Sequence, residues 1–136
     1  MTRYSIKKKF QIAYAHRLLN YNGKCENLHG HNGKIEVIIE SDKLDAQSMV
    51  MDFAEVKKRV KNWLDENLDH RVLLSEKDPL VDVLSENQQK IFTTKDNPTA
   101  EVIAITIMKE MTKRGINVKE VRFWENETSM ASVKKE

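Results

Sequence analysis

Cysteine, proline and glycine are scarce in this chain. Of its 136 residues, 1 is Cys, 2 are Pro and 4 are Gly. A single cysteine cannot form a disulfide within the chain, and the paucity of Pro and Gly argues against a flexible linker between domains. A chain of this length buries enough surface to fold as one domain, residues 1–136, without a disulfide or a structural metal. A metal bound here would therefore serve a function.

Long apolar runs and a strong net charge are also lacking. No stretch approaches the roughly 20 apolar residues that a membrane helix needs, so we expect no integral-membrane segment. The balance of 23 Lys and Arg against 21 Asp and Glu gives a formal net charge of +2, which is too small to indicate a nucleic-acid partner. The first ten residues lack the apolar run and cleavage site of a secretory signal, so we expect a cytoplasmic protein.

The spacing of apolar residues predicts an α+β domain. Residues 6–16 alternate as a strand that carries His16 on its apolar face, and residues 35–40 alternate as the second strand of a long hairpin. Helical spacing predicts one helix from Phe53 toward Leu68 and another from an Asn97-Pro98 cap to Gly115. Residues 80–94 fit either a short helix followed by a strand or an ordered loop. The last strand, residues 121–125, places Glu125 on the same face as apolar residues, where a carboxylate needs an explanation.

Three of the four histidines lie in the predicted hairpin. His29 and His31 are two residues apart, so on a strand both side chains project from one face, and His16 can approach them from the paired strand. Three neutral imidazoles leave one tetrahedral position of a zinc ion open, which is typical of catalytic zinc. The alternative is a polar hairpin whose histidines lie on the surface or are hydrogen-bonded.

The remaining polar candidates are less specific on their own. Cys25 lies four residues before His29 and could be a base, a further metal ligand or an inert buried thiol. A catalytic role would need a nearby cation or base, because only the thiolate is strongly basic. Asp69 precedes His70 at the end of the first helix, and the two could form an acid/base pair or a simple polar pair.

Several segments, taken together, resemble one enzyme family. They are AHRLLNYNGKCENLHGHNGKIEV, MDFAEVKK, LDHRVLL, PTAEVIA and FWENETSMASV. The chain is similar to the 6-pyruvoyl-tetrahydropterin synthase and 6-carboxy-tetrahydropterin synthase family over nearly its whole length. It departs from the usual residues of that family at four positions, and these departures bear on substrate preference: Tyr14, Asn126, Met130 and Val133.

The resemblance implies the tunnelling fold (T-fold). Each subunit would contribute a four-stranded antiparallel sheet with two helices on one face. Three such sheets would close into a barrel, and two trimers would stack into a homohexamer with active sites between subunits.

The same resemblance implies a role for each candidate. The zinc ligands would be His16, His29 and His31. Cys25 would be the catalytic base, Asp69 and His70 an acid/base pair, Glu125 the carboxylate that anchors the pterin, and Thr99 a neighbour of the pterin ring.

The spacing in CENLHGH resembles the bacterial queuosine-pathway branch of this family. That branch implies a zinc-dependent lyase, which converts 7,8-dihydroneopterin triphosphate to 6-carboxy-5,6,7,8-tetrahydropterin with release of acetaldehyde and triphosphate. The alternatives are a 6-pyruvoyl-tetrahydropterin synthase, which only eliminates triphosphate and rearranges, and a zinc protein that binds a pterin or purine without turnover.

Overall fold

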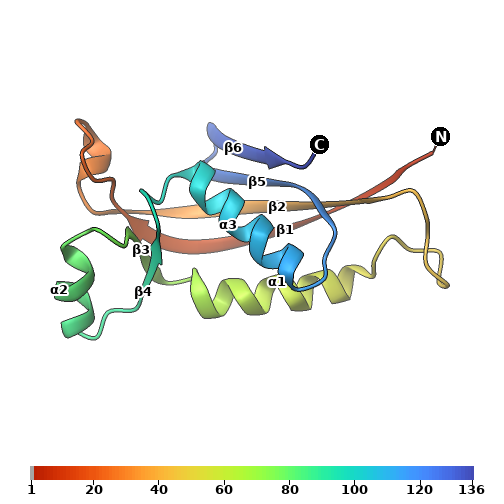
Figure 1. Ribbon diagram of the computed structural model, residues 1–136, viewed down its shortest axis with the longest axis horizontal. Coiled ribbons are helices and arrows are strands. Elements are labelled where there is room, and N and C mark those ends of the chain that lie inside the picture. Colours follow the sequence, from red (N-terminus) through yellow and green to blue (C-terminus); the bar gives the residue numbers. More distant parts are fainter. Residues whose placement is uncertain (1) are drawn as a thin grey trace.

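A mixed sheet forms one layer of the molecule, and helices cover one of its faces (Figure 1). The structure is a computed structural model that describes residues 2–136. Within that range the sheet has six strands in the order β4-β3-β1-β2-β5-β6. The strands are β1 (Tyr4–His16), β2 (His29–Ser41), β3 (Arg71–Ser75), β4 (Ile91–Thr94), β5 (Val118–Asn126) and β6 (Ser129–Lys134). The helices are α1 (Phe53–Asn67), α2 (Leu80–Glu86) and α3 (Ala100–Lys113), together with a short 3-10 helix (Lys24–Glu26).

The long hairpin predicted from the sequence is present. Strands β1 and β2 pair without interruption from Tyr4 opposite Ser41 to His16 opposite His29. Residues 17–28 form the loop that joins them and include the 3-10 helix. This register brings two of the candidate ligands side by side at the loop end of the hairpin.

The antiparallel part of the sheet is the expected four-stranded unit, but the sheet continues beyond it. Strands β1, β2, β5 and β6 pair antiparallel, whereas β3 pairs parallel to β1 and β4 parallel to β3. The two added strands have only 5 and 4 residues, too few to show a clear alternation in sequence. Within residues 80–94, the structure has the short helix followed by a strand. In Figure 1, α2 and β4 lie at the same end of the molecule as the 17–28 loop.

Both predicted long helices are present and bury their apolar stripes against the sheet. In α1 the buried residues include Trp63 and Leu64, and in α3 they include Ile103 and Met111. They pack over the buried face of β1, β2 and β5, where Ile35, Val37 and Phe123 are fully enclosed. No helix formed by residues 2–136 is long and apolar enough to span a membrane.

The predicted start of the second helix was wrong. Thr99, not Asn97, is the N-cap of α3, because the Thr99 hydroxyl accepts a hydrogen bond from the Val102 N–H at 3.2 Å. Asn97 uses its side chain elsewhere: its amide oxygen accepts from the Leu19 N–H and its NH2 group donates to the Leu19 carbonyl. Pro98 therefore precedes the cap. The predicted end at Gly115 is confirmed, since Gly115 follows the C-cap residue Arg114 with a φ of 87°.

Candidate metal centre

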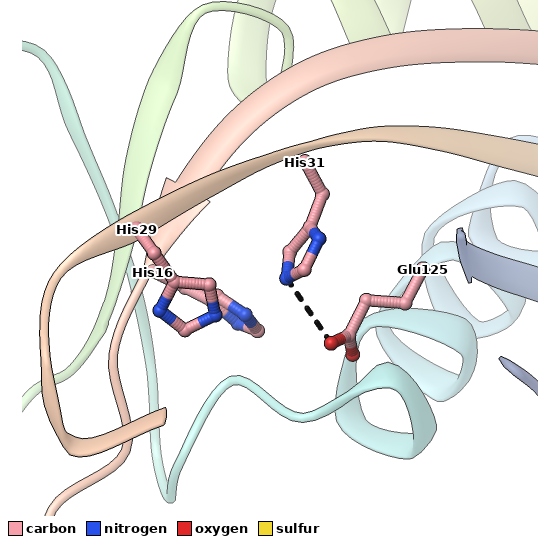
Figure 2. A group of neighbouring side chains, drawn as sticks. All are labelled: His16, His29, His31 and Glu125. Atoms are coloured by element: carbon pink, nitrogen blue, oxygen red, sulfur yellow. Dashed lines mark ion pairs between the residues drawn. The ribbon is translucent and has the colours of Figure 1, made fainter. Parts of the chain in front are cut away.

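The side chains of His16, His29, His31 and Glu125 converge at the loop end of the hairpin (Figure 2). One possible ligand atom from each residue lies within 4.8 Å of the others. The strand register explains this arrangement: His16 pairs with His29 across β1 and β2, and His31 follows His29 on the same face of β2. Glu125 reaches the group from β5, which is the neighbour of β2.

Backbone carbonyls set the orientation of two of the rings. The Nδ1 atom of His16 lies 2.8 Å from the carbonyl oxygen of Pro98, and Nδ1 of His29 lies 2.6 Å from that of Asn27. Because a carbonyl oxygen can only accept, each Nδ1 carries the proton and donates it. The Nε2 atom of each ring then bears the lone pair that binds a metal, and a carbonyl partner of this kind is usual for metal-ligating histidines.

Two buried ring nitrogens of this group lack a hydrogen-bond partner. Nε2 of His16 and Nε2 of His31 are both enclosed without a hydrogen-bond partner. Nε2 of His31 lies 3.1 Å from Oε1 of Glu125, but the contact does not have hydrogen-bond geometry. Unpaired buried polar atoms are costly, and a cation among them would satisfy both nitrogens. Imidazole nitrogen and carboxylate oxygen are zinc ligands, so these residues fit a zinc ion.

Burial keeps the rings in the form that coordination requires. Burial lowers the pKa of His16, and the hydrogen bond to Pro98 opposes this effect only in part. Burial likewise lowers the pKa of His31, against the attraction of Glu125. Both imidazoles are therefore neutral near pH 7 and need not lose a proton to bind a metal.

Tyr14 packs directly beside this group. Its ring centroid lies 5.2 Å from that of His16 and 5.6 Å from that of His31. Burial, followed by the negative charges that Glu125 and Cys25 can carry, raises the pKa of the Tyr14 phenol. The phenol therefore remains protonated at neutral pH and can act as a hydrogen-bond donor.

Cys25 and Thr99 lie outside the four-residue group. Cys25 belongs to the 3-10 helix of the hairpin loop and is half-buried, and its carbonyl accepts from the Leu18 N–H at 2.8 Å. In the described part of the chain, its sulfur is not among the clustered ligand atoms. Thr99 caps α3 through its hydroxyl and directly follows Pro98, which orients His16.

Asp69 and His70 form a pair, but the structure does not bring it into the metal group. One Asp69 oxygen lies 3.0 Å from Nδ1 of His70, and the other accepts from the Ala13 N–H at 2.8 Å. Burial would raise the pKa of Asp69, but these two hydrogen bonds outweigh it and hold the pKa below its ordinary value. The His70 side chain is 77% exposed, and its φ is 58°. The pair therefore presents an imidazole to the outside of the chain, held by an ionised carboxylate.

A family model described as 6-pyruvoyl tetrahydropterin synthase matches residues 5–136. The chain belongs to this family. It is 40% identical over 106 residues to the 6-carboxy-5,6,7,8-tetrahydropterin synthase of Rickettsia typhi. The aligned region covers 76% of this chain and 77% of that protein.

Solved structures agree on the T-fold of the family. An uncharacterized protein from Wolinella succinogenes superposes with a TM-score of 0.86 and 27% identity over 100% of both chains. The 6-pyruvoyl tetrahydropterin synthase of Caenorhabditis elegans gives a TM-score of 0.72 with 23% identity over 100% of this chain and 98% of that one. The expected fold class is confirmed.

The groups that orient the site histidines of this chain could not be recognised in its sequence. They are the carbonyl oxygens of Asn27 and Pro98, together with the side chain of Asn97, which ties the segment carrying Pro98 to Leu19. A backbone carbonyl is available at every residue, so nothing in the sequence could single out the first two. The Asn97-Pro98 dipeptide predicts a helix cap and not a bond to Leu19, because Asn is common at the cap position.

Proposed function

We propose that this chain is a zinc-dependent 6-carboxy-5,6,7,8-tetrahydropterin synthase. It would act on 7,8-dihydroneopterin triphosphate and release acetaldehyde and triphosphate, as a step toward a 7-deazapurine such as queuosine. The observation that carries the proposal is the convergence of three imidazoles, of which those of His16 and His31 are neutral and have a buried Nε2 atom without a hydrogen-bond partner. The name of the Rickettsia typhi relative supports this product over the 6-pyruvoyl product.

His16, His29 and His31 would hold the zinc, which supplies a Lewis acid that polarises the side-chain oxygens of the substrate. Cys25, as a thiolate, removes a proton from a carbon of that side chain. Glu125 lies at the edge of the same group and accepts hydrogen bonds from the N–H groups of the pterin ring, which sets the ring's orientation.

The Asp69–His70 pair would act from a neighbouring subunit. Within one chain it lies outside the metal group and exposes its imidazole. In a homohexamer built as a dimer of trimers, an exposed imidazole at an interface can protonate and deprotonate a substrate bound to the next chain. Asp69 fixes the tautomer and orientation of His70 through the contact with Nδ1.

Product analysis tests the proposal. The purified, zinc-loaded protein is incubated with 7,8-dihydroneopterin triphosphate, and acetaldehyde is followed with alcohol dehydrogenase and its reduced cofactor. We expect acetaldehyde and triphosphate in equal amounts, with 6-carboxy-tetrahydropterin as the main pterin. Triphosphate without acetaldehyde would identify a 6-pyruvoyl-tetrahydropterin synthase instead. Tight pterin binding with no product would identify a binding protein.

A further inference from the structure

The Tyr14 hydroxyl is buried without a hydrogen-bond partner. Across residues 2–136, the buried side-chain nitrogen and oxygen atoms that lack a partner are this hydroxyl, Nε2 of His16 and Nε2 of His31. An unsatisfied buried polar group costs roughly 1–3 kcal/mol, so each such atom needs an explanation. A metal ion explains the two nitrogens, but the hydroxyl is not needed to complete a three-histidine site.

The surrounding residues hold the Tyr14 ring in one place. Tyr14 pairs directly with His31 across β1 and β2, and its ring packs edge-on against His16 and Phe123. Gly33 makes room for this packing, because a Cβ atom there would lie 3.0 Å from Cε1 of Tyr14 and 2.8 Å from Cζ of Phe123. The hydroxyl can spin about its C–O bond, but the ring cannot swing away to reach another partner.

The unpaired hydroxyl lies among the groups of the candidate site. Its ring touches the two histidines whose Nε2 atoms are also unpaired, and Glu125 and Cys25 are near enough to act on it electrostatically. A neutral phenol in such a position can donate one hydrogen bond to an oxygen atom that enters with a ligand.

We propose that Tyr14 is a substrate-binding residue whose hydroxyl donates a hydrogen bond to a hydroxyl oxygen on the side chain of the bound pterin. This inference rests on the proposed function, since it requires a pterin in the site. Glu125 would hold the ring of the pterin, while Tyr14 distinguishes an oxygen-bearing side chain from an apolar one.

Calorimetric titration with two stable ligands tests the assignment. The probes are neopterin, whose side chain carries hydroxyls, and 6-methylpterin, whose side chain carries none. In the zinc-loaded protein, Tyr14→Phe is expected to weaken neopterin binding roughly three- to tenfold and to leave 6-methylpterin binding unchanged. Without ligand, the variant should melt at the same or a higher temperature, because it removes a buried unpaired hydroxyl. Tyr4→Phe, at a 40% exposed tyrosine, is the matched control and should change neither affinity.

Each other outcome overturns the proposal. Unchanged neopterin binding in Tyr14→Phe would show that the hydroxyl makes no contact with the side chain. Equal losses for both ligands would show that Tyr14 only shapes the pocket. Failure of the wild-type protein to bind either pterin would contradict the proposed function as well, and it would be seen before any variant is compared.

Discussion

Nδ1 of His16 lies 2.8 Å from the carbonyl oxygen of Pro98, which is 82 residues further along the chain. This contact joins the end of β1 to the segment that leads into α3. Next to it, the Asn97 side chain pairs with both the N–H and the carbonyl of Leu19, at 2.8 and 2.9 Å. The orientation of a candidate zinc ligand thus depends on a segment that supplies no ligand itself.

Replacing Asn97 should therefore weaken zinc binding, although Asn97 is not itself a ligand. Asn97→Ala removes both bonds to Leu19, and we expect it to lower the free energy of unfolding by about 1–3 kcal/mol. Zinc affinity should fall by about tenfold or more, because the Pro98 carbonyl loses its fixed position. Chelator competition and urea unfolding measure the two effects. Asn62→Ala, on the exposed face of α1, is the control, and an equal loss of zinc affinity in it would contradict this explanation.

Removing a ligand should remove the metal. The wild-type protein is expected to hold about one zinc per chain, and His29→Ala should lose it, because two imidazoles do not hold zinc tightly. His70→Asn is the matched control: it removes the fourth histidine, and Asn tolerates the positive φ at that position. Elemental analysis decides the matter. Full zinc occupancy in His29→Ala would exclude His29 from the ligand set.

Glu125 stands close enough to act either on the metal or on the pterin. If it anchors the ring, Glu125→Gln should weaken neopterin binding about 10- to 100-fold, because one acceptor oxygen becomes an NH2 group that faces ring N–H donors. Zinc content should remain the same. Glu127→Gln, at an exposed neighbour, should bind neopterin normally. Zinc loss in ligand-free Glu125→Gln would instead make Glu125 a metal ligand.

Cys25 is predicted to be the base rather than a ligand. Its sulfur is not part of the clustered ligand atoms of residues 2–136, so Cys25→Ala should keep zinc and pterin binding nearly unchanged. Turnover should fall at least about a hundredfold, since proton transfer loses its acceptor. Metal analysis and a single-turnover assay separate the two roles. If zinc is lost, the sulfur coordinates the metal.

An ion pair beside the site, between half-buried Arg17 and buried Asp78, should give the protein a marked sensitivity to acid. Arg17, which follows His16, donates from Nε to Oδ2 of Asp78 at 2.7 Å and from a second nitrogen to Oδ1, and the Asp78 side chain is fully buried. The Arg17 hydrogen bonds hold the pKa of Asp78 below its ordinary value, although burial opposes them. Because the pKa is lower in the folded state, this stabilisation is present above about pH 4 and is lost as the pH falls through the folded pKa.

Asp78→Asn tests this effect. At pH 7 it should lower the free energy of unfolding by about 3 kcal/mol, because it leaves the Arg17 charge without its partner. The difference from the wild type should stay constant down to about pH 4 and shrink as the pH falls further, as measured by urea unfolding. Asp65→Asn, which breaks the exposed Lys61–Asp65 pair, should have little effect at any pH. A difference that does not depend on pH would contradict the assignment to Asp78.

The sequence alone indicated the five longest helices and strands and the three histidines. Burying one face of a strand or helix imposes a period of two or 3.6 residues, so β1, β2, α1, α3 and β5 could be recognised from spacing. The same period placed His29 and His31 on one face and Glu125 beside Val121 and Phe123. Strand β3 could not be found in this way, and β4 was one of two alternatives, because β3 pairs with the edge of β1 and β4 with β3, and neither has a clear pattern of its own.

Only the tertiary structure decided what surrounds these residues. It showed that the Pro98 carbonyl orients His16, that Asp69 holds a His70 imidazole exposed on the outside of the chain, and that Tyr14 fills the space over Gly33 with its hydroxyl unpaired. These contacts join residues that are far apart in the sequence, or they use backbone atoms that every residue has. Local periodicity determines which face of an element is buried. Which atoms then meet depends on how the elements pack, and this is settled only when the whole chain has folded.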